Sequence, residues 1–423
     1  MRSDFWKFFA GQTISNLGSS FTGFAIPLLV YKLTGSALSL AGATAAYFLP
    51  YLLFGLVIGA WVDRVDRKRM MIAVDIGRAL VIALIPILAY ADALSIWVIY
   101  VGAFAISSLS IAFDSGQFAA VPSLVGKNEL VTANGRIQAS YAAASVAGPL
   151  LAGVTLAVAS VEDIFLIDAA SFLVSAASLA LVRRSFNPEQ PPEKKHLLRD
   201  VQEGLRYVLG HPVLRNISVM MAMFNFVVST LWAQLVLFGK VRLDAGDTKI
   251  AILFAAGSAG VVVFGVSAGA IRKRLSFSVA ALGALMLSGA LTVVFAANTW
   301  YWAALVLWGA IQGLGLFFNI NTTSLRQAIV PGHMLGRVVS IAGVLAWSAI
   351  PAGTMVGGAV IKATGDVAAV YGAIGVIVFC IAASFWFTAL GRADQYLTKR
   401  EEGVAEDVGL EDRGLAPDAP DLA

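Results

Sequence analysis

Charged side chains are scarce in this chain except in one short segment. Of the 423 residues, 58% are hydrophobic and only 13% are charged. The segment Gly59–Arg69, GAWVDRVDRKR, nevertheless places six charged side chains within the seven positions 63–69. Basic residues in such a cluster can fix the side of a membrane on which a loop stays. An acid contributes little to that sorting, so Asp63 indicates a specific contact.

Three further acids lie inside long apolar stretches, where a buried charge is costly and an ionisable residue is a functional candidate. Asp75 has Arg78 three residues on, a helix-neighbour spacing that predicts a structural ion pair near the inner surface. Asp168 lies near the outer end of its stretch, where we expect a structural role. Asp114 has no adjacent basic partner in the sequence, and burial would favour its protonated form, so it is the candidate proton carrier. The alternative is that Asp114 is a structural acid.

The sequence contains no motif that indicates catalysis or metal binding. No nucleophile with a nearby histidine and no phosphate-binding loop occurs, so we do not expect an enzyme. The lone Cys380 offers no metal pair, and His196, His211 and His333 are scattered without ligand spacing. We therefore expect neither a metal site nor a cofactor.

The apolar stretches are the elements that position these residues. The mean hydropathy of +0.80 is typical of polytopic membrane proteins. A spanning helix needs about 20 apolar residues. Twelve such runs occur, at 6–31, 38–62, 71–91, 95–118, 134–158, 164–182, 214–239, 250–271, 277–297, 300–324, 338–361 and 368–390. The first lacks a small-residue cleavage site, which predicts a retained helix rather than a signal peptide. The expected fold is an all-α membrane protein.

The basic residues predict how the chain is oriented. If both termini are cytoplasmic, 25 of the 30 Lys and Arg residues lie inside and 5 outside, in agreement with the positive-inside rule. The net charge of +4 then reflects topology rather than nucleic-acid binding. We expect a multi-pass protein of the inner (plasma) membrane with both termini in the cytoplasm.

A polar interior segment divides the chain in two. The charged, proline-rich stretch after Arg183 indicates a cytoplasmic linker. The amphipathic pattern from Leu197 to Val208 fits either a helix on the membrane surface or one packed on the protein. We expect a six-helix bundle at 1–185, the linker with its amphipathic helix at 186–212, a second six-helix bundle at 213–391 and a disordered cytoplasmic tail at 392–423.

The two halves also resemble each other. Gly59-Ala-Trp-Val-Asp-Arg has a counterpart 210 residues later in Gly269-Ala-Ile-Arg-Lys-Arg, and Ala-Asn-Gly135-Arg has one 201 residues later in Met-Leu-Gly336-Arg. Similar offsets in two places imply an internal duplication. Twelve spans built as two six-helix repeats are the architecture of major facilitator transporters.

The charged loop resembles the signature of this family: a glycine, three residues, Asp-Arg and a basic cluster, here Gly59, Asp63, Arg64, Arg67 and Lys68. One departure is an acid at position 66, where the signature prefers glycine. The resemblance implies a latch, in which Asp63 accepts hydrogen bonds at the start of span eleven, near Gly336 and Arg337, when the cytoplasmic side is closed. An acid at a helix N-terminus contributes about 0.3–1 kcal/mol, or up to ~2 kcal/mol when partly buried. The alternative for the bases is that they only fix topology.

The chain further resembles the drug:proton antiporter branch that contains macrolide exporters and the enterobactin exporter. The resembling stretches are Gly11–Gly18, Asp75–Ala79, Leu124–Gly135, Asp168–Ser175, Glu203–Val208 and Met334–Val338. Many drug antiporters carry an arginine in span four, and this chain has none between Ser95 and Val125.

Span five resembles the antiporter signature, with Ala144 and Ala152 in place of two glycines. Small residues let helices approach closely, and proline bends a helix by removing a backbone hydrogen bond. The helix-packing and bending candidates are Gly148, Pro149, Gly153 and, in span eleven, Pro351. Generic helix packing is the alternative reading.

The resemblance also implies that spans one, four, seven and ten line a central cavity. Each carries polar or bulky residues at helical spacing. These substrate-cavity candidates are Gln12, Asn16, Ser107, Ser110, Gln117, Met221, Asn225, Ser229, Trp232, Trp308, Gln312 and Asn319. Amides and hydroxyls beside Trp and Met suit a large amphipathic ligand. The alternative is that the polar groups only hold helices together.

These features predict an exporter that works by alternating access and exchanges protons for an amphipathic small molecule, such as a macrolide-like drug or a siderophore. The alternative is a proton-coupled uptake permease for a small nutrient, which the sparse, neutral lining disfavours. A channel is disfavoured by the two-fold repeat and the latch. We expect a monomer in the lipid bilayer, with a small molecule and protons as its ligands and no nucleic-acid partner.

Overall fold

The computed structural model describes residues 3–62, 64–126, 129–187, 197–272, 274–330 and 332–393, and all regular structure in these ranges is helical. The elements are α1 (Ser3–Thr34), α2 (Ala37–Val62), α3 (Arg67–Tyr90), α4 (Ile96–Leu124), α5 (Leu130–Thr155), α6 (Val161–Leu181), α7 (Leu197–Gly210), α8 (Pro212–Ala233), α9 (Leu235–Arg242), α10 (Asp247–Arg272), α11 (Phe277–Ala297), α12 (Tyr301–Ile329), α13 (Gly332–Trp347), α14 (Ala349–Thr364), α15 (Val367–Trp386) and a 3₁₀ turn, η2 (Ala389–Arg392). Within the described residues, twelve helical segments are long and apolar enough to cross a membrane. This confirms the predicted all-α membrane fold.

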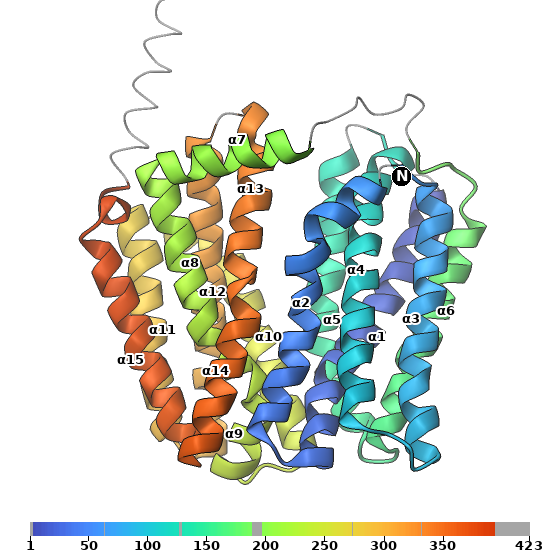
Figure 1. Cartoon of the computed structure of the whole chain (residues 1–423), viewed down its shortest axis with the longest axis horizontal. Coiled ribbons are helices and arrows are strands. Elements are labelled where there is room, and N and C mark those ends of the chain that lie inside the picture. Colours follow the sequence, from blue (N-terminus) through green and yellow to red (C-terminus); the bar gives the residue numbers. More distant parts are fainter. Residues whose placement is uncertain are drawn as a thin grey trace, which may run out of the picture.

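The long helices form two bundles that stand side by side, α1–α6 in one and α8–α15 in the other (Figure 1). Close contacts between helix backbones hold each bundle together. A Cβ atom added to Gly18 of α1 would lie 2.2 Å from Ser171 Oγ of α6, and one added to Gly260 of α10 would lie 1.8 Å from the Gly309 carbonyl oxygen of α12. Such approaches require residues without a side chain and stabilise membrane helices through van der Waals packing.

Two predicted spans are interrupted in the structure. The span predicted at 214–239 ends with α8 at Ala233, and the chain turns at Gln234 before α9. The Gln234 side chain is fully buried and donates a hydrogen bond from Nε2 to the Ala37 carbonyl of α2, 2.7 Å away. A tertiary contact across the bundles, which helical periodicity does not encode, therefore accompanies this break.

The span predicted at 338–361 is split at Ser348 into α13 and α14. Pro351 explains the position of this break. Proline has no N–H to donate to the carbonyl four residues earlier, at Trp347, and its ring clashes with that carbonyl. The helix therefore ends at Trp347 and starts again at Ala349.

The amphipathic helix α7 lies across one end of the second bundle (Figure 1). Its Val208 is completely buried in a cluster with Leu214, Val330, Val338 and Ile341, from α8, α13 and the chain just after α12. The apolar side of α7 thus covers the ends of these helices.

The two bundles meet at the end of the molecule opposite α7. Asp247, the first residue of α10, accepts contacts from Lys32 of α1 at 2.7 Å and from Lys240 of α9 at 2.5 Å. The contact with Lys32 and the bond from Gln234 to Ala37 join the first bundle to the second, whereas the contact with Lys240 holds Asp247 within the second bundle.

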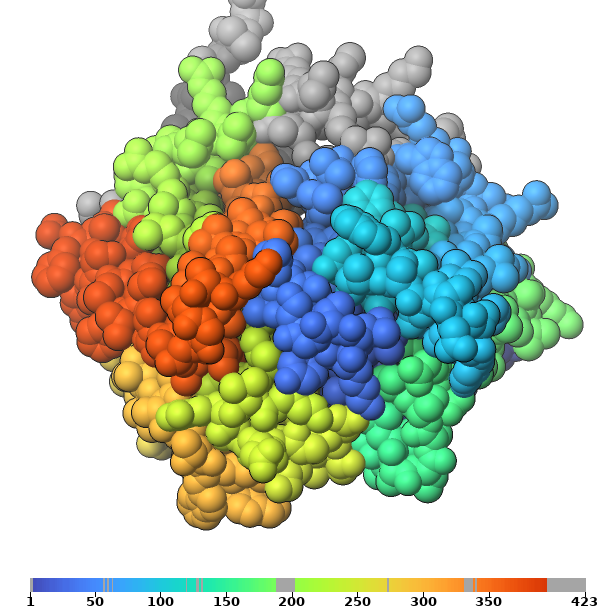
Figure 2. All heavy atoms as spheres, turned by 60° about the horizontal axis from the view of Figure 1, so that its bottom comes forward, coloured from blue at the N-terminus to red at the C-terminus, as the bar shows by residue number. Residues whose placement is uncertain are grey.

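Glycines bring the backbones together at the same end. A Cβ atom on Gly358 of α14 would lie 2.6 Å from the Ala41 Cβ of α2, and one on Gly153 of α5 would lie 2.8 Å from the Ala251 Cβ of α10. In Figure 2, where this end comes forward, the orange surface of α14 abuts the blue surface of α2. The bundles are therefore sealed against each other at this end.

Candidate functional site

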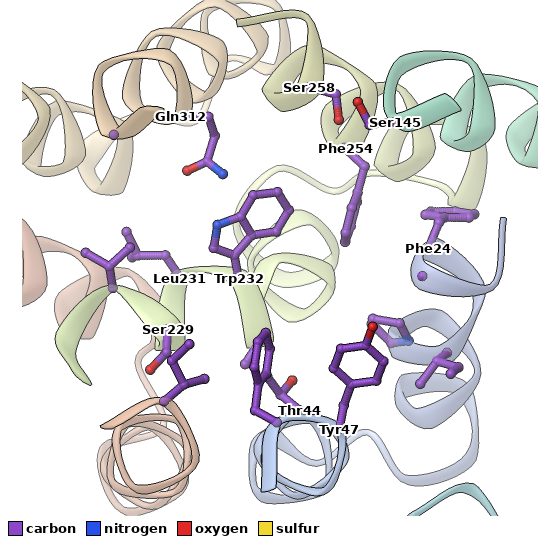
Figure 3. A pocket seen from close by; sticks show the side chains of 18 of the residues that line it. Phe24, Thr44, Tyr47, Ser145, Ser229, Leu231, Trp232, Phe254, Ser258 and Gln312 are labelled. Carbon is purple, nitrogen blue, oxygen red and sulfur yellow. The ribbon is translucent and has the colours of Figure 1, made fainter. Parts of the chain in front are cut away.

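A cavity of about 790 Å³ lies between the two bundles. Figure 3 shows aromatic rings and small polar groups pointing into it from both sides. Thr44 and Tyr47 come from α2, whereas Trp232, Phe254 and Gln312 come from the second bundle. The wall combines a large apolar area with scattered hydrogen-bonding groups, which is the composition of a site for a drug-sized ligand.

Six of the twelve predicted cavity residues line this space: Ser110, Asn225, Ser229, Trp232, Gln312 and Asn319. The hydroxyls of Ser110 and Ser229 donate to the carbonyls of Ile106 and Phe226 in their own helices, at 2.8 and 3.0 Å. Because a hydroxyl oxygen has two lone pairs, these groups can still accept hydrogen bonds from a ligand.

The other six predicted residues do not line the cavity, and for three of them a contact between helices explains why. Gln12 donates to Ser175 Oγ of α6 at 2.8 Å. Gln117 donates to the phenol of Tyr141 on α5 at 3.2 Å. Met221 Sδ accepts a hydrogen bond from the buried Arg326 of α12 at 3.0 Å. In this conformation these three side chains contact neighbouring helices instead of lining the cavity.

The remaining three, Asn16, Ser107 and Trp308, each bury a polar atom that has no hydrogen-bond partner among the described residues. Trp308 is fully buried behind the cavity wall, with its ring 5.5 Å from that of Trp232. It therefore supports a wall residue instead of forming the wall.

Several wall residues come from helices that the sequence analysis left out. Tyr47 and Phe48 belong to α2, Ser145 to α5, and Phe254 and Ser258 to α10. The i, i+4 spacing of Phe254 and Ser258 is a signal that could have identified them. It was missed because only spans one, four, seven and ten were expected to contribute.

Asp75 and Arg78 form a buried ion pair. Arg78 Nη1 lies 3.4 Å from Asp75 Oδ1, and the two side chains are 7% and 0% exposed. The guanidinium also lies over the rings of Phe113 and Phe172, at 4.5 and 5.3 Å from their centroids. Ser175 Oγ donates to the second carboxylate oxygen of Asp75 at 2.6 Å. The ion pair expected from the spacing of Asp75 and Arg78 is thus present and lies inside the first bundle.

Asp114 and Asp168 differ from the sequence expectations in their surroundings. Asp114 is accessible to water in the C-terminal half of α4, and it interacts electrostatically with Arg78 and with the phenols of Tyr47, Tyr51 and Tyr141. Asp168, expected to be structural, lines the cavity and is 1% exposed.

The charged loop is described only in part. Asp63 lies outside the described residues, and for Gly59, Gly336 and Arg337 the structure gives a helical backbone in α2 and α13 without their surroundings. Arg64 is exposed.

The described bases of this loop bind the chain that follows α6. Arg67 Nη1 donates to the Phe186 carbonyl at 3.2 Å, and Lys68 Nζ donates to the Val182 carbonyl at 2.5 Å. Cations interact favourably with the free carbonyls at a helix C-terminus. In this conformation the two bases therefore attach the loop to its own bundle.

The helix-packing candidates of α5 lie at close contacts. A Cβ atom on Gly148 would lie 2.4 Å from the Ser20 Cβ of α1, and Gly153 meets Ala251 of α10. Pro149 lines the cavity, and α5 continues through it without interruption.

Comparison with known proteins gives a consistent result. The family model of the Major Facilitator Superfamily matches residues 8–354. The chain is 26% identical over 362 residues to macrolide efflux protein A of Streptococcus pyogenes, covering 82% of this chain and 87% of that protein. It is 28% identical over 375 residues to the multidrug efflux pump Tap of Mycolicibacterium fortuitum, covering 84% and 88%.

A solved structure shares the fold. A bacterial homologue of the human lysosomal transporter Spinster, crystallised in an inward-facing and unoccupied conformation, superposes with a TM-score of 0.71 at 15% identity. The match covers 94% of this chain and 97% of that one.

Proposed function

Because this chain belongs to the Major Facilitator Superfamily and is therefore a transporter, we propose that it exports an amphipathic small molecule, such as a macrolide-like compound or a siderophore, in exchange for protons. The observation that carries the proposal is the cavity of about 790 Å³, whose described wall consists of aromatic rings, neutral polar groups and one acid, Asp168. In such a site apolar area provides affinity and a few polar groups set orientation. Two relatives are named as a macrolide efflux protein and a multidrug efflux pump, and these names support export of a drug-like small molecule.

The distribution of basic residues supports the direction of access. In the topology predicted from the sequence, 25 of the 30 Lys and Arg residues lie on the same side of the membrane as the linker that contains α7, and that side would be cytoplasmic under the positive-inside rule. The contacts of Asp247 and Gln234 seal the opposite end. Cargo would then reach the cavity from the cytoplasm and leave after the bundles at 1–185 and 213–391 rock about it.

Asp114 is the proposed proton-release group on the cytoplasmic side. It is accessible on α4, where water can take its proton, and it interacts electrostatically with Arg78 and with the phenols of Tyr47, Tyr51 and Tyr141. Release of this proton would leave a negative charge on the face that must close, so transport would depend on the protonation state of Asp114.

The loop at 59–69 is the proposed latch for closing this same side. Arg67 and Lys68 fasten the loop to the end of α6, so it would move with the first bundle. When the bundles close, Gly59, Asp63 and Arg64 would meet the start of span eleven at Gly336 and Arg337. The weak contacts expected at a helix terminus are sufficient to bias a nearly balanced pair of states.

A susceptibility panel tests the proposal. An efflux-deficient host would express wild type, Asp63→Asn and Asp114→Asn at matched levels and be challenged with macrolides, tetracyclines, phenicols, dyes and siderophores. We expect wild type to raise resistance to at least one class, and both variants and collapse of the proton gradient to abolish it. Loss in Asp63→Asn alone would support the latch and move the proton site elsewhere. Rescue of a nutrient auxotroph without any resistance would replace export by uptake.

A further inference from the structure

Asp168 differs in its surroundings from the other two acids within the spans. Asp75 is neutralised by Arg78 at 3.4 Å, and Asp114 is exposed. Asp168 is 1% exposed, lines the cavity and forms no ion pair among the described residues. It is also the only charged side chain among the described residues of the cavity wall.

Two hydroxyls lie against the Asp168 carboxylate. Thr22 Oγ1 of α1 donates to Oδ2 at 2.5 Å. Ser171 Oγ lies 3.1 Å from Oδ1, and its closer acceptor is the Asp168 backbone carbonyl at 2.8 Å. Gly18, one turn before Thr22, makes room for the group, since a Cβ atom there would lie 2.6 Å from Asp168 Oδ1. The site is thus formed by the close approach of α1 and α6.

The charged neighbours of Asp168 lie on α3. Arg78 and Asp75 interact with it electrostatically. Their charges are opposite and neutralise each other within a buried pair, so they leave no net counter-charge for Asp168. From α1 it meets Thr22 and Gly18, and both are uncharged. An ionised carboxylate buried without a cation is strongly disfavoured, and hydrogen bonds from hydroxyls compensate only in part. A proton can remove the imbalance.

We infer that Asp168 is a second proton-binding carboxyl of this transporter, reached through the cavity and positioned by Thr22 and Gly18. The inference rests on the proposed proton exchange. A hydronium ion in the cavity gives its proton to a carboxylate oxygen and leaves water. The new carboxyl O–H donates to Thr22 Oγ1, whose hydroxyl can reverse its role because it is both donor and acceptor.

The ligand is a proton and not the cargo. A side chain that is 1% exposed offers no surface to a bulky ammonium group, whereas water can deliver a proton. Because the cavity lies between the two bundles, rocking would connect the same carboxyl to either side of the membrane in turn. One carboxyl could then load its proton outside and release it inside.

Transport by the purified full-length protein in liposomes tests the inference, with erythromycin as the probe. Two rates are compared: uptake driven by an imposed pH gradient, and exchange of labelled for unlabelled erythromycin without a gradient. Asp168→Asn should lose driven transport by roughly tenfold or more while exchange stays within about twofold of wild type. Asp163→Asn removes an exposed acid at the start of the same helix and should keep both rates.

The second readout does not depend on transport. Dicyclohexylcarbodiimide, an apolar reagent, modifies protonated carboxyls, and mass spectrometry of peptides locates the adduct. We expect labelling of Asp168 that declines as pH rises and no labelling of Asp75. Thr22→Val should change the pH profile of Asp168 labelling, whereas Thr22→Ser, which keeps the hydroxyl, should not. A purely structural role for Asp168 would give no such profile.

The outcomes separate this inference from the proposed function. If wild type shows no gradient-driven transport, the proton exchange fails, and absence of labelling would also overturn the Asp168 site. If the pH gradient drives erythromycin uptake equally fast in wild type and in Asp168→Asn, the inference is wrong, while Asp114 can still account for proton coupling. Loss of exchange in folded Asp168→Asn would indicate a cargo contact and overturn the inference. If that variant does not fold, labelling of wild type is the test. Labelling of Asp168 that declines as pH rises would support the inference, and labelling without a pH dependence would overturn it.

Discussion

Asp75 and Arg78 illustrate at the scale of single residues how a membrane bundle holds charge. With side chains 0% and 7% exposed, each is the other's main compensation, and the rings of Phe113 and Phe172 complete the enclosure of the guanidinium. Removing both partners of a buried pair is often tolerated, whereas removing one leaves an uncompensated charge.

Arg78→Met should therefore destabilise the protein by about 3–5 kcal/mol, and adding Asp75→Asn should restore most of the loss. Thermal unfolding of the detergent-solubilised protein, followed by size-exclusion chromatography, measures both. Arg69→Ala is the matched control, because its pair with Asp66 has side chains 89% and 53% exposed and should contribute under about 1 kcal/mol. Equal unfolding temperatures for Arg78→Met and wild type would show that the ion pair does not stabilise the protein.

Of the residues in the cavity wall, Trp232 is the one whose removal should weaken cargo binding most. It is 40% exposed to the cavity, and its ring contacts those of Trp308 and Phe254 with centroids 5.5 and 6.2 Å apart. Burial of a large apolar side chain contributes about 1.5–3 kcal/mol. Trp232→Ala should thus weaken erythromycin binding roughly ten- to hundredfold.

Titration of the purified protein with erythromycin measures the effect of Trp232→Ala. Trp97→Ala provides the comparison, since Trp97 is 71% exposed on α4 and absent from the cavity wall. Weakening of the same size in both variants would mean that the cavity is not where erythromycin binds.

At the scale of elements, the sequence could predict what depends on local patterns. Apolar runs located all twelve spans, because the bilayer demands a fixed helix length. They did not locate the break at Gln234, which depends on the Ala37 carbonyl of another helix. Helical spacing likewise showed that Gln12 and Asn16 share a face but not what that face meets. In the structure Gln12 meets Ser175 rather than the cavity.

The break between α13 and α14 has a local cause that can be removed. Pro351→Ala would supply the N–H that the Trp347 carbonyl lacks, so the two helices should join. We expect stabilisation of up to about 3 kcal/mol, slower hydrogen exchange of the amides around Ser348 and slower transport, because a hinge is lost. Pro86→Ala is the control, as Pro86 lies inside the unbroken α3. Unchanged exchange near Ser348 would show that Pro351 does not cause the break.

At the scale of the whole molecule, function depends on the balance between contacts at the two ends of the bundles. The sealed end carries one acid between two bases, with Asp247 2.7 Å from Lys32 and 2.5 Å from Lys240. Lys32 is in the first bundle and the other two are in the second. The contact between Lys32 and Asp247 must break whenever this end opens, so it favours the conformation described here over the alternative one.

Asp247→Asn should therefore open the sealed end more often. The Lys32 contact joins the two bundles, and a contact at such a partly exposed site contributes about 0.2–1 kcal/mol, so its loss should shift the closed-to-open ratio by roughly 1.4- to fivefold. Spin labels on cysteines at Thr34 and Gly246, in a background with the exposed Cys380 changed to serine, report the distance across this end.

The distance distribution in Asp247→Asn should gain a longer component, and Asp92→Asn, which removes a charge from the α3–α4 loop of the first bundle, should not produce it. If Asp247→Asn leaves the distribution unchanged, the closing free energy must come from uncharged contacts. The candidates are then the bond from Gln234 to Ala37 and the approach of Gly358 to Ala41. Gly358→Ala would disturb both, because its added methyl group would lie 2.6 Å from the Ala41 Cβ, 3.0 Å from the Ala37 carbonyl oxygen and 3.5 Å from Gln234 Nε2. Gln234→Leu, which removes the hydrogen bond to Ala37 and leaves Gly358 and Ala41 as they are, would distinguish them.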